Sequence, residues 1–425
     1  MRNRRARRQP PGTRAGWLAG LGAIGVLAIV ALSAAFAPRP SGVAIATRGL
    51  GSSPFATAVP AASASSAAAS PSPAPSSSDQ PPPVAGPVAS VTNVYAGAGA
   101  GMFSPAVAGL PPRVYVPDEL TGTVVVIDPT TFKILYRYKV GASPEHVTPD
   151  WDLQRLYVEA AFADHLTVIS PKTGRPTGHH TVPGPYNLYF SLDGTKAIVV
   201  LDSRLAGSSY DAHQLYFYDR RTWKLIKAVR VPWAGADHLD FSADGAYFLL
   251  STEYSGWVAK VDVKRMAVTD ALYVGGRPID VRLAPDGRLF YVANQGTNGV
   301  AIIDPTRMRQ VGFIKTGRGA HGLAISRDAR WLYVTNRLAG TLSVIDFTTR
   351  RLIHTWRIGG TPDMIAVSPD GTQLWISNRY SGSVTVANGQ TGHVIKVIRV
   401  GGHPHGLAYF PEPGTLSLGH NGIYR

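Results

Sequence analysis

Ionisable side chains recur in this chain at one place, directly after a turn proline or its equivalent, about every 42 residues. The first residues after these turns are Glu145, Tyr186, Asp237, Ile279, His321, Asp363 and His405, and the second are His146, Asn187, His238, Asp280, Gly322, Met364 and Gly406. Histidine and carboxylate are the ligands that Zn, Mn, Fe and Cu take where thiolate is missing. The 425-residue chain has no cysteine, so these side chains are the ones suited to hold a metal or a polar ligand.

We predict a ligand-binding site made of ten of these residues: Glu145, His146, Tyr186, Asn187, Asp237, His238, Asp280, His321, Asp363 and His405. The metal ligands predicted within it are His238, His321, His405 and Asp237. The sequence names no cofactor, although this set of donors suits a divalent metal ion. The alternative is structural: the polar residues belong to the repeat itself and face channel water or bond to neighbouring loop backbone.

The elements that must position these residues follow from an internal repeat. A unit of about 42 residues occurs seven times between Arg113 and Phe410. An Asp-Gly-like turn marks the register at Asp152, Asp193, Asp244, Asp286, Asp328 and Asp370, with Glu412 in the last copy. Each copy holds short β-branched and aromatic runs, and self-similarity at this period is typical of four-stranded propeller blades. We therefore predict an all-β fold, a seven-bladed β-propeller.

The ends of the repeat array predict how the ring closes. The first copy lacks its innermost strand, whereas the last copy has an innermost strand at residues 406–410 and no second, third or fourth strand after it. We expect this C-terminal strand to complete the first blade, because closure removes the open sheet edges. Aspartates end the third strand of five copies and are expected to cap the next turn. They are Asp128, Asp219, Asp262, Asp304 and Asp346.

One copy carries about nine extra residues, between Leu201 and Leu215. Strand direction places this loop on the same face of the ring as the turns that precede the innermost strands. Loops on a rigid scaffold often carry binding residues. The candidates in it are Arg204, Tyr210, Asp211 and His213. The alternative is a neutral surface insertion.

The N-terminal part differs in composition from the repeats. Arginines precede an uncharged apolar run at residues 17–37, long enough to span a bilayer as one helix. Residues 1–37 are thus a signal peptide or signal anchor, residues 38–112 an Ala/Ser/Pro-rich disordered linker, residues 113–414 the propeller and residues 415–425 a C-terminal tail. We predict a cell-membrane protein with a single N-terminal span and an extracytoplasmic propeller. The alternative is secretion after cleavage at Ala35-Phe36-Ala37.

The formal net charge of +15 raises the question of an anionic partner. Arginines of the N-terminal segment supply much of it, and the basic residues of the repeats are spread over many turns, which favours a solvated surface. This distribution disfavours a nucleic acid as the partner, whereas an anionic polymer of the cell envelope is still a candidate.

The repeats also carry a family motif. Leu332-Tyr333-Val334-Thr335-Asn336 and its variants Tyr291-Val292-Ala293-Asn294 and Trp375-Ile376-Ser377-Asn378 resemble the YVTN-repeat β-propeller family over residues 113–412. Relatives in that family include surface-layer and secreted binding proteins, lactonase-like hydrolases, lyases and cytochrome d1-type domains. The resemblance therefore implies the fold and leaves the activity open.

Three functions are compatible with these observations, and the third, binding of nucleic acid or an anionic polymer through the basic surface, ranks below the other two. The first is an exported, membrane-tethered, monomeric propeller that binds a cell-envelope protein, a polymer or a small polar ligand. The alternative is a metal-assisted lactonase-like hydrolase or lyase, in which the ion polarises a carbonyl and His321 or His405 moves a proton. No nucleophile elbow, phosphate-binding loop or His-Glu-x-x-His pattern is present, so the sequence does not by itself establish an enzyme.

Overall fold

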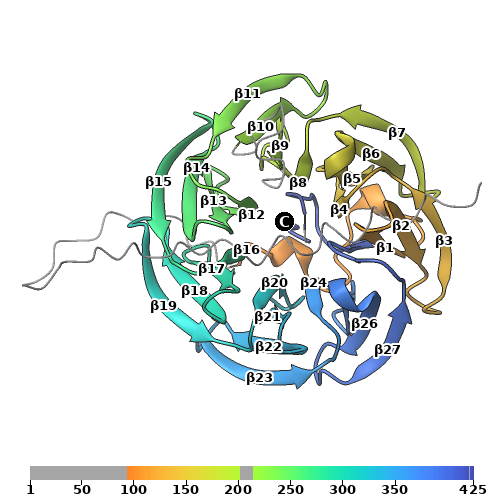
Figure 1. The fold of residues 1–425 in the computed structure, drawn as a ribbon. Helices are drawn as coiled ribbons and strands as arrows, with labels where there is room; N and C mark the ends of the chain where they lie inside the picture. The colour runs from red at the N-terminus through yellow and green to blue at the C-terminus, as the bar shows by residue number, and fades with distance from the viewer. Residues whose placement is uncertain (1–92, 202–213, 421) are drawn as a thin grey trace, which may run out of the picture. The chain divides into compact units, whose positions relative to one another are not determined.

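A computed structural model describes residues 93–201, 214–420 and 422–425. They form seven four-stranded antiparallel sheets in a ring, which confirms the predicted seven-bladed propeller (Figure 1). Within these three ranges no helix is long and apolar enough to cross a membrane. The predicted anchor, the linker as far as residue 92 and the four insertion candidates lie outside the described residues.

Each blade is built of strands that we letter A to D from the axis outward. The first contains β28 (Ala408–Phe410), β1 (Arg113–Asp118), β2 (Thr123–Ile127) and β3 (Ile134–Lys139). The second contains β4 (Pro144–Pro149), β5 (Leu156–Ala160), β6 (His165–Ser170) and β7 (Arg175–Thr181). The third contains β8 (Pro185–Phe190), β9 (Lys196–Leu201), β10 (Gln214–Asp219) and β11 (Leu225–Arg230). The fourth contains β12 (Ala236–Phe241), β13 (Tyr247–Thr252), β14 (Trp257–Asp262) and β15 (Ala267–Tyr273).

The remaining three blades follow the same order. The fifth contains β16 (Pro278–Leu283), β17 (Phe290–Asn294), β18 (Gly299–Asp304) and β19 (Arg309–Lys315). The sixth contains β20 (Ala320–Ile325), β21 (Trp331–Asn336), β22 (Thr341–Asp346) and β23 (Arg351–Arg357). The seventh contains β24 (Pro362–Val367), β25 (Gln373–Asn378), β26 (Ser383–Asn388) and β27 (Val394–Arg399). Short 3-10 turns occupy two B–C loops, η3 (Ala161–Ala163) and η5 (Arg379–Ser381).

The ring closes as the repeat predicts. Strand β28 pairs antiparallel with β1, with Arg113 opposite Phe410 and Tyr115 opposite Ala408. A segment about 300 residues later in the chain thus completes the first blade. Every A strand consequently has a B strand beside it, and β1 is not left as the edge strand of its sheet.

Burial explains why the inner strands are so apolar. All six residues of β16 are buried, whereas the outer strand β3 is exposed along most of its length. The core lies between adjacent blades: Ile198 and Phe217 of the third blade share a cluster with Phe241 and Phe248 of the fourth. Because each blade needs two neighbours to bury both faces, the closed ring supplies the core.

Local polar contacts shape the turns. The Ser191 hydroxyl donates to Asp193 Oδ1 at 2.5 Å, and Gly194 follows with φ +64°, a conformation that favours glycine. The five aspartates predicted to cap the C–D turns each accept a backbone N–H two or three residues later, at distances of 2.6–2.9 Å. That prediction is confirmed.

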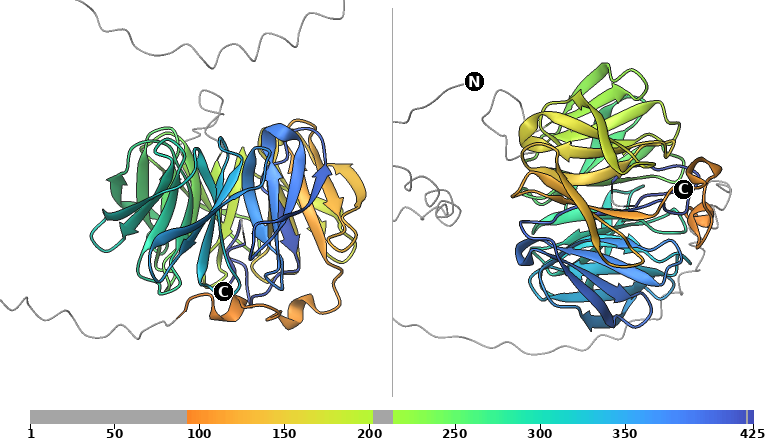
Figure 2. Two further views of the ribbon diagram at one scale, coloured as in Figure 1. Left: turned by 90° about the horizontal axis from the view of Figure 1, so that it is seen from below. Right: turned by 90° about the vertical axis from the view of Figure 1, so that its right-hand side faces the viewer.

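Residues 93–112 differ from the prediction of a disordered linker up to residue 112. They contain η1 (Ala96–Ala98) and η2 (Pro105–Val107) and lie across the face of the A–B turns, where Figure 2 shows them as the orange segment. Val94 N donates to Pro285 O at 2.8 Å, and the Tyr95 hydroxyl donates to Leu283 O at 2.8 Å. Tyr95 and Val107 are buried and give this segment the apolar anchors that a pure Ala/Ser/Pro linker lacks.

The C-terminal tail, residues 415–425, enters the centre of the ring from that same face (Figures 1 and 2). Leu418 O accepts from Phe190 N at 3.0 Å, and His420 N donates to Leu188 O at 3.0 Å. Leu418 is fully buried, and His420 is as well. The tail is therefore an internal part of the propeller that occupies its axis.

Candidate binding site at the mouth of the channel

The ten predicted site residues lie around the axis of the ring. Nine of them are among the first three residues of an A strand, and His405 lies shortly before β28. Nine of their side chains are buried, at 0–3% exposure, and Tyr186 is half-buried. The predicted site residues are therefore buried, because neighbouring blades and the C-terminal tail fill the channel at this level. Gly406 illustrates the close packing: a Cβ there would lie 1.8 Å from His146 Cδ2.

One group of these residues is an ion-paired network centred on Asp363. His405 lies between two carboxylates, with Nδ1 3.0 Å from Glu145 Oε2 and Nε2 3.3 Å from Asp363 Oδ2. Arg337 pairs with Asp363 and also contacts His321 Nε2. His321 Nδ1 lies 3.6 Å from Asp363 Oδ1. The network ties blades one, two, six and seven together at the axis.

Burial controls the protonation of this network. It lowers the pKa of His405 and of His321 well below the ordinary value, and the adjacent guanidiniums of Arg379 and Arg337, respectively, lower it further. Burial also raises the pKa of Asp363, against the opposing charge of Arg337. The two imidazoles are therefore neutral near pH 7 and act as hydrogen-bonding groups there.

A second group is formed by histidines. His146 Nδ1 bonds to the Tyr186 carbonyl at 2.9 Å, and His238 Nδ1 lies 2.7 Å from Asp237 Oδ1. Burial, followed by the charge of His238, lowers the pKa of His146 to about 3. Burial opposes protonation of His238 too, but the attraction of Asp237 outweighs it and raises the pKa of His238. His238 therefore takes up a proton more readily than His146 does.

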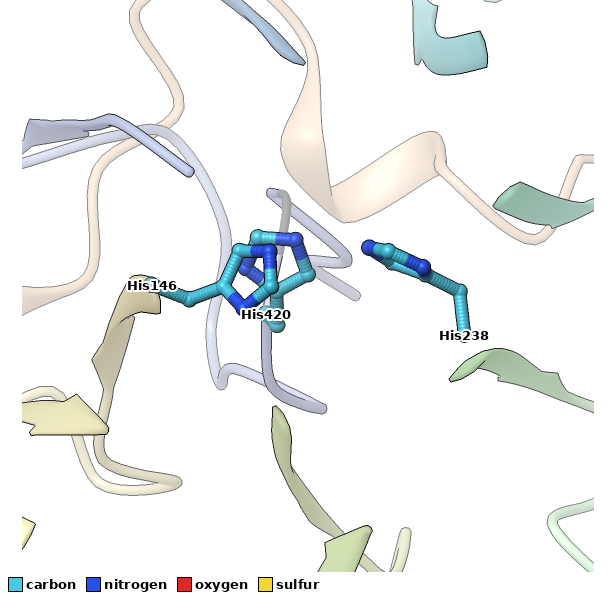
Figure 3. Close-up of side chains that lie close together, drawn as sticks. All are labelled: His146, His238 and His420. Carbon is cyan, nitrogen blue, oxygen red and sulfur yellow. The ribbon is translucent and has the colours of Figure 1, made fainter. Parts of the chain in front are cut away.

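The third member of this group is His420, which sequence reasoning missed. The ring centroids of His146 and His420 are 3.8 Å apart, and those of His238 and His420 are 5.1 Å apart (Figure 3). Within the described ranges, these three histidines are the one group of three or more ligand-type side chains close enough to hold an ion. Of the four metal ligands predicted from the sequence, only His238 belongs to it, whereas His321 and His405 lie in the network around Asp363.

Two predicted site residues have structural roles. Asp280 Oδ2 accepts from Leu323 N of the next blade at 2.8 Å, and Asp240 Oδ2 accepts in the same way from Leu283 N at 2.7 Å. Asn187 Nδ2 donates to Asp237 O at 3.0 Å. The Asp280 and Asn187 side chains thus bond to strand backbone of neighbouring blades.

A pocket of about 320 Å³ opens over the ring, on the face of the D–A and B–C loops. Its charged lining residues are Glu119, Asp237, Glu253, Arg277, Arg337 and Arg379, and its aromatic ones are Tyr186, Tyr254, Tyr380 and His403. Sequence reasoning missed most of them. Two of the missed residues could have been found from the family motif, because Arg337 directly follows its Asn336 and Arg379 directly follows the equivalent Asn378.

Exposed apolar side chains surround this pocket. The second residue after each B strand is Leu120, Phe162, Tyr254, Gly296, Leu338 or Tyr380 in the six B–C loops that the structure describes. We call the five large members of this set the apolar rim, and they are 49–67% exposed. On the face where the sequence predicts binding, a charged pocket thus opens among exposed apolar loop residues, two of which, Tyr254 and Tyr380, line it.

The fold and this face define the chain as a seven-bladed β-propeller with a polar mouth over a closed channel. It belongs to the YNCE-like β-propeller family, whose model matches residues 82–412. A comparison with curated proteins finds no match.

Solved structures share the fold. A functionally unknown protein from Desulfotomaculum acetoxidans is 19% identical, with 70% of this chain and 98% of that chain covered and a TM-score of 0.59. The periplasmic gluconolactonase of Pseudomonas aeruginosa is also 19% identical, with 71% and 99% covered and a TM-score of 0.58. Kuenenia stuttgartiensis hydrazine synthase is 18% identical, with 61% and 87% covered and a TM-score of 0.52. At these identities the likeness concerns the fold alone.

Proposed function

We propose that this protein is an exported binding propeller, held at the cell membrane by its N-terminal apolar segment, that docks a protein partner of the cell envelope. The docking face is the one with the D–A and B–C loops. The observation that carries the proposal is the apolar rim around the charged pocket, because both features come from equivalent positions of successive blades.

The apolar rim has the composition of a protein contact surface. Leu120 is 67% exposed, Leu338 60% and Tyr380 59%, although each stands in a loop where a polar residue would be better solvated. Apolar side chains scattered singly over a surface are ordinary, but their repetition around one pocket marks an interaction site. Tyrosine and arginine together are also enriched at the centres of protein interfaces.

The pocket supplies the polar part of such an interface. Arg277 pairs with Glu253 at 2.5 Å, and Arg379 pairs with Glu119. Arg337 and Arg379 both lie beside the Tyr380 ring, with guanidinium carbons 5.8 and 5.7 Å from its centroid. Charges held in place before binding fix the orientation of a partner and reject mismatched ones. We infer that a charged side chain of the partner enters the pocket while its apolar residues contact the rim.

The lactonase-like alternative rests on a likeness in fold, and the histidines oppose it. His146, His238, His321 and His405 have exposures of 0–3% and lie beneath the pocket floor. A general acid or base must come within hydrogen-bonding reach of the group that it serves. A substrate in the pocket meets arginine, tyrosine and carboxylate side chains together with His403, and the four axial histidines are not among the lining residues, so we favour binding over catalysis.

Site-directed photo-crosslinking in intact cells tests the proposal. A photoreactive residue at position 338 is expected to give one discrete adduct with a protein partner, because Leu338 is on the apolar rim. The matched control is position 225, since Leu225 is 51% exposed but lies on the outer strand β11. The Arg379→Ala change should weaken the adduct formed from position 338. Identical bands from positions 338 and 225, or no adduct from 338, would overturn the proposal.

A further inference from the structure

Three histidines from distant parts of the chain face one another on the axis of the ring. His146 stands in β4, His238 in β12 and His420 in the C-terminal tail, and Figure 3 shows their rings directed toward a common centre. One nitrogen from each can be chosen so that all three lie within 4.8 Å of one another. All three side chains are completely buried. The cluster therefore exists only because the tail enters the channel.

The polar surroundings orient two of these rings as metal ligands are oriented. His146 Nδ1 is bonded to the Tyr186 carbonyl, and His238 Nδ1 lies beside the Asp237 carboxylate. Metal-bound histidines almost always use their second nitrogen in this way, toward a carbonyl or a carboxylate. In the neutral ring with its proton on Nδ1, each of these two histidines has a lone pair on Nε2 for an ion.

The remaining nitrogens lack partners. His146 Nε2 and both nitrogens of His238 and of His420 make no hydrogen bond within the part of the chain that the structure describes, although His238 Nδ1 lies 2.7 Å from Asp237 Oδ1. Buried polar atoms are ordinarily hydrogen-bonded, so five such atoms in one cluster require an explanation. One ion bound to three imidazoles would satisfy three of them together.

We propose that His146, His238 and His420 bind one borderline transition-metal ion of the Zn²⁺, Ni²⁺ or Cu²⁺ class, which fastens the C-terminal tail in the channel. Imidazole nitrogen suits these ions, whereas Mg²⁺ and Ca²⁺ prefer oxygen ligands. At zinc–nitrogen distances of 2.0–2.1 Å, tetrahedral geometry needs ligand atoms about 3.3 Å apart. Binding of an ion therefore requires the three ligand nitrogens, now within 4.8 Å of one another, to move closer together. The proposal is independent of whether the apolar rim binds a partner.

Metal content and ligation test this site directly. The full-length chain, purified in detergent without a polyhistidine tag and stripped with a chelator, is titrated with Zn²⁺ and with Co²⁺. We expect one tightly bound ion per chain and, by X-ray absorption at the zinc edge, imidazole nitrogens at 2.0–2.1 Å. His420→Ala should weaken binding at least 100-fold, and Asp237→Asn about 10–100-fold, as loss of a supporting carboxylate does. His354→Ala is the matched control, because His354 lies on the outer strand β23.

The folding of each variant is checked by circular dichroism, and the zinc-edge measurement on the unmodified chain does not depend on any variant. Zinc should also raise the melting temperature of the parent and of His354→Ala but leave that of His420→Ala unchanged. The proposal is overturned if the parent binds no zinc in stoichiometric amount. It is equally overturned if a folded His420→Ala protein binds zinc as the parent does, since the ion is then adventitious.

Discussion

Replacing Leu418 by alanine tests whether the C-terminal tail is part of the folded core. Leu418 is fully buried and belongs to the apolar cluster that contains Ile423 of the tail and Tyr189 and Phe241 of the third and fourth blades. Truncating a buried leucine to alanine costs about 2–5 kcal/mol, because apolar contacts are lost and a cavity is left. Each kcal/mol lowers the melting temperature by about 1.6 °C in a domain of roughly 300 residues, because the entropy of unfolding grows with size. We expect the melting temperature to fall by about 3–8 °C.

The assay is thermal unfolding of the full-length chain, followed by circular dichroism. Leu225→Ala is the control, since Leu225 is 51% exposed on β11 and its truncation should change stability by no more than about 0.5 kcal/mol. If Leu418→Ala melts within about 2 °C of the parent, the tail does not pack in the channel, and the histidine cluster that depends on it cannot form.

Two further predictions concern the N-terminal segment and the turns. If residues 17–37 are an anchor, the full-length protein fractionates with membranes, and protease releases a propeller core that still contains residues 93–112; recovery from the cytosol alone would contradict this. The second concerns Asp193, Asp244 and Asp370, where burial would raise the pKa but hydrogen bonds from serine hydroxyls and backbone N–H groups outweigh it and lower the pKa. Their stabilising effect is present above the unfolded pKa of about 3.9 and is lost as pH falls through the lower folded pKa. The melting temperature should therefore drop below about pH 4, and less steeply in Asp370→Asn; equal slopes in both proteins would refute the assignment.

The repeat alone determined the architecture. The spacing of the Asp-Gly turns counted the blades, and the unmatched strands at the two ends predicted the pairing of β28 with β1, which the structure has. The aspartate caps of the C–D turns, such as Asp128 and Asp346, were also predicted correctly. These features are local or involve neighbouring strands, so a pattern in the sequence is enough to specify them.

The identity of the axial residues was also visible in the sequence, because each follows the same turn. The side chains that these residues contact were not visible in the sequence. Whether His405 joins Glu145 and Asp363 or a metal group depends on side-chain directions across the ring, which the repeat leaves unspecified. Their functional roles stay predictions that the experiments above address.

Only the three-dimensional packing decided where the segments before and after the repeat array are placed. Residues 93–112 and 415–425 carry no copy of the unit, so their sequence gives no register, yet the first covers the A–B face and the second brings His420 to His146. The apolar rim likewise becomes a surface only when loops some 42 residues apart are arranged around one axis. Contacts across a closed ring join positions far apart in the chain, and their geometry is set by the packing of all seven blades together.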